Sequence, residues 1–295
     1  MFDRMFANYL AECGKLSDSD LEDIYAAQDS KRVRLGVIAV SEKLMTIDQV
    51  EEVNQLQAIL DKRFGDIAVE KGYLNAEQVS RLLVLQGNAY LAFVQAVVDG
   101  GYLSMEEVED MLVRYQKDNN LTLSNIEDLK SCDINRIINI FLYTQNDMAK
   151  EMVGVFIRTI VRLVDFHSYI KKPSVLKEYP FKVLCTQGIS GDHKILTSLS
   201  GDLNPDMKAI ASSFAGEVNV TCDEDVLDAL CELINCVNGL YATDVSNREI
   251  DIDMEAPLGQ NEAGILKAAN ILCVPMVVCN KPIDFLLVID QDYTY

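Results

Sequence analysis

A repeat with a step of 29 residues constrains the fold of this 295-residue chain more than any other feature. One apolar series in register is Leu16, Met45, Leu74 and Leu103. The residue after each is a good helix N-cap, and an acid or glutamine follows three residues later, as in a capping box. These pairs are Ser17–Asp20, Thr46–Gln49, Asn75–Gln78 and Ser104–Glu107. The repeat predicts an all-α domain over residues 1–117, made of four helix-turn-helix units.

The hydrophobic pattern changes after residue 145. A helix pattern is followed by two strand patterns around GISGD, two further helices and three further strands. This order predicts an α+β domain over residues 146–295, with helices packed on an antiparallel sheet. Its second helix is expected to have Asn204 as N-cap and to end at Gly216. Residues 118–145 predict a connector of short helices with Ser124 and Asp133 as N-caps.

The charge balance limits the classes of partner. The chain has 26 basic and 46 acidic residues, a net charge of −20. Binders of nucleic-acid polymers and anionic membranes are normally basic, so both are disfavoured. The sequence predicts no signal peptide and no membrane insertion, so we expect a cytoplasmic protein. It contains no C-x-x-C pair, so we expect its cysteines to be free thiols. Neither His167 nor His193 has a partner at zinc-ligand spacing, so we expect no metal site in the chain.

The two middle repeat units share residues that the outer units lack. Each has an arginine, an apolar residue and a glycine in succession, then a glutamine: Arg34, Leu35, Gly36 and Gln57, and Arg63, Phe64, Gly65 and Gln86. A guanidinium stacks and forms paired hydrogen bonds, and a glycine lets a ligand approach the backbone. Two such sets of residues, one after the other in the chain, suit a ligand with two-fold chemical symmetry. Lys31, Arg32 and Lys62 would add positive charge for phosphates.

These segments resemble the N-terminal domain of type II secretion and type IV pilus ATPases, called MshEN or GspE-N, over about residues 30–90. The resemblance implies that the two sets, Arg34, Leu35, Gly36 and Gln57 with Arg63, Phe64, Gly65 and Gln86, bind cyclic di-GMP as an effector. Two positions depart from the family pattern: Lys43 replaces the glycine present as Gly72 in the second copy, and Phe64 replaces leucine. The alternative is a docking module without a ligand.

The segment DALCELINCVNG, residues 228–239, predicts an amphipathic helix with a polar stripe. Asp228, Glu232 and Asn235 are spaced i, i+4 and i+7, so they share one exposed face. Spacing alone favours a solvated face. The same Glu-x-x-Asn pattern at Glu51 and Asn54 is interpreted in that way.

The elements around this helix resemble the CheX branch of the CheC/CheX/FliY chemotaxis phosphatases over about residues 146–295. The matching residues are Asp228, Glu232, Asn235 and Gly239. The resemblance implies hydrolysis of the aspartyl phosphate on a CheY-like receiver, which itself holds magnesium. Asn235 would orient the attacking water and Glu232 would engage a cationic group of the receiver, with Asp228 and Gly239 in support.

Only one helix of this domain carries Glu-x-x-Asn, which by the same resemblance implies one site per subunit and a homodimer. The alternative function is non-enzymatic: a scaffold of the same fold that binds receivers or parts of the flagellar switch. In that case Glu232 and Asn235 would be interface residues only.

Overall fold

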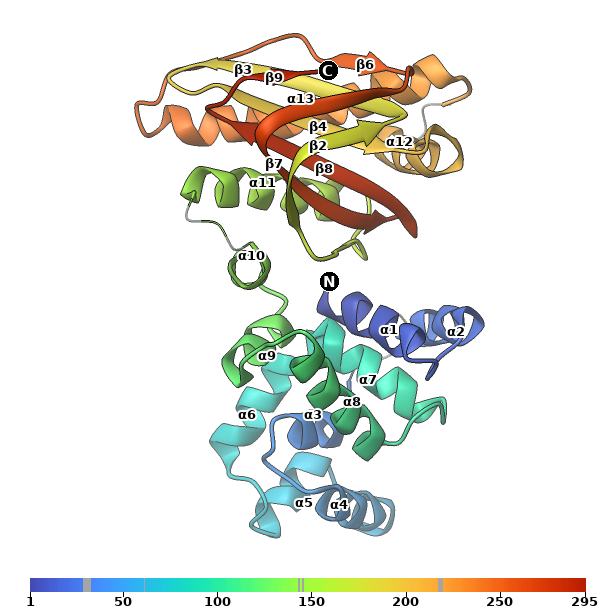
Figure 1. The fold of residues 1–295 in the computed structure, drawn as a ribbon. Coiled ribbons are helices and arrows are strands. Elements are labelled where there is room, and N and C mark those ends of the chain that lie inside the picture. Colours follow the sequence, from blue (N-terminus) through green and yellow to red (C-terminus); the bar gives the residue numbers. More distant parts are fainter. Residues whose placement is uncertain (29–32, 61, 143, 145, 217–219) are drawn as a thin grey trace. The chain divides into compact units, whose positions relative to one another are not determined.

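The computed structural model describes residues 1–28, 33–60, 62–142, 144, 146–216 and 220–295 (Figure 1). They form two compact units, divided between Asp133 and Ile134. The first unit is helical, and the second combines helices with an antiparallel sheet, which confirms the predicted class of each. The predicted connector is shared between them, since α9 (Leu123–Lys130) lies in the first unit and α10 (Ile134–Phe141) in the second.

Eight helices of the first unit follow one another in four pairs. They are α1 (Phe2–Glu12) with α2 (Asp18–Gln28), α3 (Leu35–Ser41) with α4 (Ile47–Leu60), α5 (Phe64–Glu70) with α6 (Ala76–Val84), and α7 (Ala89–Asp99) with α8 (Met105–Asp118). Each pair turns at a residue of positive φ: Gly14, Lys43, Gly72 and Gly101. Glycine adopts this conformation at the lowest cost. Lys43 thus adopts, between α3 and α4, the turn conformation that Gly72 adopts between α5 and α6.

All four predicted capping boxes are present. The Ser17 hydroxyl accepts from the Asp20 N–H at 3.2 Å, and the Asp20 carboxylate accepts from the Ser17 N–H at 2.8 Å. The same reciprocal bonds join Thr46–Gln49, Asn75–Gln78 and Ser104–Glu107. The prediction of Ser124 as a cap is wrong: Thr122 caps α9, because its hydroxyl accepts from the Asn125 N–H at 3.1 Å.

Nine strands form the sheet of the second unit, counted over its described residues. They are β1 (Tyr169–Ile170), β2 (Ser174–Phe181), β3 (Val183–Gly191), β4 (Ile195–Gly201), β5 (Ile252–Met254), β6 (Leu258–Gln260), β7 (Gly264–Val278), β8 (Lys281–Ile289) and β9 (Tyr293–Thr294). The central order is β1-β7-β8-β4-β3-β5, and β2 pairs with β7. Strands β3, β4, β5, β7 and β8 correspond to predicted ones, whereas β1, β2, β6 and β9 were not predicted.

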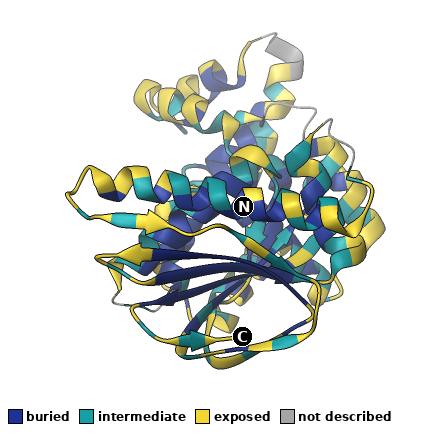
Figure 2. Cartoon of the chain, turned by 90° about the horizontal axis from the view of Figure 1, so that it is seen from above, coloured by how far each residue is buried: buried dark blue, intermediate teal, exposed yellow. Residues whose placement is uncertain are grey.

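The central strands are buried on both faces (Figure 2). On one face Phe285 of β8 stacks on Phe156 of α11 (Asp147–Leu163), with ring centroids 4.0 Å apart. On the other face, side chains of β2 and β7 pack against those of β3, β4 and β8, because the sheet curls. That cluster comprises Phe181, Leu184, Leu196, Leu266, Ile271, Cys273, Leu286 and Val288.

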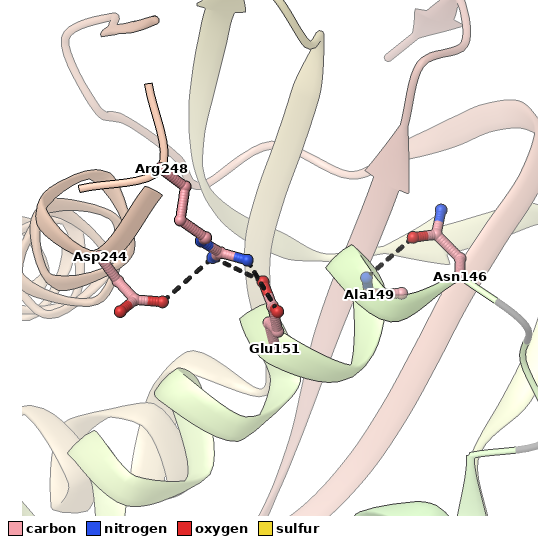
Figure 3. Close-up of polar contacts among 5 residues, drawn as sticks. All are labelled: Asn146, Ala149, Glu151, Asp244 and Arg248. Carbon is pink, nitrogen blue, oxygen red and sulfur yellow. Dashed lines mark hydrogen bonds and ion pairs between the residues drawn. The ribbon is translucent and has the colours of Figure 1, made fainter. Parts of the chain in front are cut away.

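Two long helices are tied to each other at their ends. Asn146 caps α11 by accepting from the Ala149 N–H at 3.1 Å. Arg248 follows α13 (Asp223–Ser246) and forms ion pairs with Glu151 of α11 at 2.7 Å and with Asp244 of α13 at 3.1 Å (Figure 3). These bonds stabilise the position of α13 relative to the rest of the second unit.

The helix before α13 begins differently from the prediction. Asn204 has the extended backbone typical of an N-cap, but a turn of π-helix (Leu203–Met207), with a cis peptide bond at Asn204–Pro205, leads into α12 (Lys208–Ala215). The Asn204 amide instead donates to Asp223, at the start of α13, at 3.2 Å. Gly216 ends α12 with a positive φ, as predicted.

In the described part of the chain, no single helix has both the length and the apolar character needed to cross a membrane. One bent pair of helices, Ala76–Gly87 with Ala89–Asp99, meets that requirement by length and composition alone.

Candidate functional site

Helix α13 presents one apolar face and one polar face, as its periodicity predicts. Its predicted apolar positions are buried or half-buried against the sheet: Val226, Leu227, Leu230, Leu233, Ile234 and Val237. Asp228 and Glu232 are exposed on the opposite side, and Asn235 is half-buried. The helix therefore brings the acid and the amide together at the surface.

Glu232 and Asn235 are neighbours within this surface. The Asn235 amide donates to the Glu232 carboxylate at 3.4 Å, a long and therefore weak hydrogen bond. No ion pair holds Glu232 within the described residues, so its charge faces solvent. Gly239 lies one turn after Asn235, and no atom lies within 4 Å of where its Cβ would be. The surface beside Asn235 is therefore open.

The start of α13 carries additional negative charge. Asp223, Glu224 and Asp225 occupy its first turn, where acids are favourable to the helix dipole. N–H groups of Thr221 and Cys222 donate to the Asp225 carboxylate and lower its pKa, so this carboxylate stays charged. Together with Asp228 and Glu232, the helix offers an anionic surface suited to a cationic partner.

Cys231 is buried immediately before Glu232, next to Cys185 of β3. A hydrogen bond with the Cys231 thiol, together with burial, raises the pKa of the Cys185 thiol. A protonated, buried thiol is a poor nucleophile. Cys185 is therefore not a candidate for covalent catalysis.

Sequence reasoning missed the polar residues beneath Asn235. Gln187 of β3 donates to the Asn235 side-chain oxygen at 3.0 Å, and Asn238 lies behind it. Gln187 falls at the end of the strand pattern FKVLCTQ and Asn238 in the helix motif NCVNG. The one signal available in the sequence was a polar amide side chain within an apolar segment, and that signal did not indicate which residue the amide would bond to.

The first unit contains a cavity of about 570 Å³. Six of the eight residues predicted to bind a nucleotide line it: Arg34, Leu35, Gly36, Gln57, Arg63 and Phe64. Gly65 and Gln86 are not among the lining residues, and the Gln86 amide donates to the Val33 carbonyl oxygen at 2.7 Å. Glu51 and Asn54 also line the cavity, and both are exposed, which agrees with the predicted solvated face.

Packing between helices accounts for the two glycines of the shared pattern. A Cβ on Gly36 would lie 2.6 Å from Val50 Cγ1 and 3.2 Å from the Phe64 ring. A Cβ on Gly65 would lie 2.9 Å from Val79 Cγ1. These contacts are too short for a side chain, so both glycines are required by the neighbouring helices whether or not a ligand binds.

Gly36→Ala is expected to destabilise the first unit by about 1–3 kcal/mol, because overpacking a close contact forces neighbouring side chains to shift. Thermal unfolding of the ligand-free chain measures this loss. Gly87→Ala is the matched control, since no atom lies within 4 Å of where its Cβ would be and its φ is not positive. Equal stability of the two variants would contradict the packing role.

The positive charge near the cavity is partly neutralised. The Arg34 side chain is 57% exposed and forms an ion pair with Asp99. Lys62 pairs with Glu70 at 2.7 Å, so its charge is not free for phosphate as predicted. Arg63 is exposed, and no ion pair of its guanidinium occurs in the described part of the unit. Lys31 and Arg32 lie outside the described residues.

Comparison with known proteins gives weak and consistent similarities. No family model matches the sequence, and no curated protein matches it significantly. Among solved structures, a chemotaxis protein CheX from Desulfovibrio desulfuricans is 14% identical, covering 49% of this chain and 99% of its own, with a TM-score of 0.42. A CheC-like protein from a Shewanella species is 17% identical, covering 50% and 99%, with a TM-score of 0.42.

A third solved structure is a CheX–CheY–BeF3–Mg complex from Borrelia burgdorferi. The matched chain is 18% identical, the match covers 48% of this chain and 97% of that one, and the TM-score is 0.38. Similarity at this level does not assign an activity to the chain.

Proposed function

We propose that the second unit hydrolyses the aspartyl phosphate of a CheY-like receiver domain. The observation that carries the proposal is the pairing, on the exposed side of α13, of a free carboxylate at Glu232 with an anchored carboxamide at Asn235. The surface beside them is open at Gly239, so a partner domain can reach both groups. Receivers act in the cytoplasm, so the proposal places the chain there.

Asn235 and Glu232 can supply what a phosphorylated receiver lacks for this reaction. A phosphorylated receiver supplies the magnesium ion and the cationic groups that stabilise phosphoryl transfer. It lacks a water held in line with the phosphorus. A carboxamide both donates and accepts hydrogen bonds, so Asn235 can hold that water without acting as a base. The rate gain would come from orientation.

Glu232 would bind the partner through a cationic side chain of the receiver. Its exposed carboxylate is one turn from Asp228, so the α13 surface attracts positive charge as a whole. With one Glu-x-x-Asn helix in the second unit of each chain, we propose a homodimer that carries two sites. This assembly is supported by the family resemblance alone.

Glu232→Gln is expected to raise the protein concentration that gives half-maximal dephosphorylation about 10- to 100-fold, because one charge-assisted contact is worth about 1.5–3 kcal/mol. The maximal rate is expected to change less. Titrating each variant against phosphorylated receiver, at low and moderate salt, measures both quantities. Glu106→Gln, an exposed acid in the first turn of α8 in the first unit, is the control. A Glu232→Gln variant that behaves like this control would remove the docking role.

The proposed activity is tested by the lifetime of the phosphorylated receiver with and without this protein. A shortened lifetime in the presence of the protein supports a phosphatase. An unchanged lifetime together with detectable binding supports the scaffold alternative instead.

We also propose that the first unit binds cyclic di-GMP. The observation in favour is that six residues of the tandem pattern line one cavity, whose volume is ordinary for a ligand pocket. Arg34 and Arg63 supply guanidinium groups for stacking or phosphate contacts, and the cavity has apolar residues such as Val50 and Val98. Calorimetry with the nucleotide tests this proposal.

A further inference from the structure

Two carboxamides are buried directly beneath Asn235. Gln187 of β3 is 1% exposed and Asn238 of α13 is fully buried. Buried amides destabilise a fold unless their donors and acceptors are paired. Neither residue lies at a loop or a helix end, so a role in capping does not explain them.

The buried amides form a connected set of hydrogen bonds. Gln187 Nε2 donates to Asn235 Oδ1 at 3.0 Å and to the Glu255 carbonyl oxygen at 2.8 Å. Asn238 Nδ2 donates to Gln187 Oε1 and to Thr197 Oγ1, each at 2.8 Å. The Thr197 hydroxyl donates in turn to the Gln187 carbonyl oxygen at 3.3 Å. The set thus runs from β4 through β3 to the surface of α13.

The edge of the sheet provides the anchor for this set. Strand β5 pairs with β3 at Ile189–Gly191 and β6 pairs with it at Leu184–Thr186. Gln187 lies between these two pairings, beside the segment 255–257 that joins β5 to β6. The Glu255 carbonyl oxygen is therefore free to accept from the Gln187 side chain.

That carbonyl oxygen determines the direction of every hydrogen bond in the set. A backbone carbonyl can only accept, so the end of Gln187 that faces it must be the NH2 group. The Asn235 atom that contacts the same NH2 group must then be the oxygen. The opposite end of Gln187 is an acceptor, so Asn238 must present its NH2 group to it.

This arrangement of hydrogen bonds leaves one buried acceptor unused. The oxygen of Asn238 is left buried without a hydrogen-bond partner among the described residues. Such a group costs about 1–3 kcal/mol. The buried, connected bonds restrain the group at their exposed end, which is Asn235.

We propose that Gln187 is a positioning residue, which holds the Asn235 carboxamide with its oxygen inward and its NH2 group toward Glu232 and the partner. The inference rests on the proposed phosphatase function. The restrained amide presents a donor of fixed direction to the attacking water or to a phosphoryl oxygen. The second lone pair of Asn235 Oδ1 remains available to accept from the water.

Gln187→Met tests the proposal, because methionine has a similar size and cannot donate. At saturating protein, the rate of dephosphorylation is expected to fall about 10- to 100-fold, as for a catalytic group that is no longer held in place. The half-saturating concentration is expected to stay the same, because Glu232 is untouched. Thr186→Val is the control: it removes a buried hydroxyl from the neighbouring position of β3, whose partners are Thr197 O and Ser198 Oγ.

Gln187→Glu provides a second readout that a merely structural role would not change. Burial raises the pKa of a carboxyl group, and only its protonated form has a donor: a single O–H, for which Asn235 Oδ1 and the Glu255 carbonyl oxygen compete. The rate of this variant, relative to wild type at each pH, is expected to fall as pH rises. A ratio that is constant with pH would overturn the inference.

Asn235→Ala separates failure of the inference from failure of the proposed function. If Asn235→Ala is inactive and Gln187→Met retains the wild-type rate, Gln187 does not position the amide and the phosphatase function stands. If both variants retain the wild-type rate, the assignment of Asn235 fails and the inference fails with it. If the wild-type protein itself does not accelerate dephosphorylation, the proposed function fails. In the Asn235→Ala background, Gln187→Met is expected to cause no further loss of rate.

Discussion

Replacing Asn235 by alanine is expected to abolish acceleration of receiver dephosphorylation, with a loss of about 100-fold or more. The Asn235 carboxamide is held from within by Gln187 at 3.0 Å, and in the proposed complex its NH2 group would face the partner. Loss of orientation of a reacting water is worth this much when the other reactants are already in place. The time course of phosphate loss from the receiver measures the effect.

The folded state is expected to tolerate this change. Asn235 is half-buried, and alanine removes one hydrogen bond to Gln187, a loss of about 1–3 kcal/mol with the partner left unpaired. Asn247→Ala, at the other end of α13, is the matched control and is expected to keep the wild-type rate. An Asn235→Ala variant with wild-type activity would sink the assignment of the site.

The double substitution of Arg34 and Arg63 by alanine is expected to remove cyclic di-GMP binding. Hydrogen bonds to charged groups contribute about 1.5–3 kcal/mol each, so the loss of two arginines weakens binding by more than about 100-fold. Titration calorimetry on the intact chain measures it. Arg81→Ala is the control, since that exposed arginine pairs with Glu42 and does not line the cavity.

The ion pair between Arg34 and Asp99 provides a second test of nucleotide binding. If Arg34 binds the nucleotide, the ligand competes with Asp99 for the guanidinium. Asp99→Asn is therefore expected to tighten binding. Absence of a heat signal from the wild-type chain, in a buffer where its fold is intact, would remove the nucleotide proposal altogether.

Local patterns predicted much of the structure. The four capping boxes were correct because a cap depends on residues three positions apart. The polar face of α13 was correct for the same reason, since helical spacing decides it. The start of α12 was not predicted, because a turn of π-helix precedes it and the Asn204 side chain donates to Asp223 of the next helix.

Features that depend on distant residues could not be predicted in this way. Strand β2 has a shift in register between Leu176 and Glu178, and its exposure does not alternate from residue to residue. The link between Gln187 and Asn235 joins residues 48 positions apart. The position of Glu51 and Asn54 at the rim of a cavity was not predicted, because helix spacing does not reveal which other helices surround them.

The central claim is tested most directly by turnover of a phosphorylated receiver with catalytic amounts of the wild-type chain. CheY-like receivers from the same organism are phosphorylated with a small-molecule phosphodonor, freed of it, and mixed with a much smaller amount of the protein. For one of them, phosphate release is expected to rise in proportion to the protein and to exceed one phosphate per chain. Receivers that bind the protein and yet lose phosphate at their own unassisted rate would contradict the account.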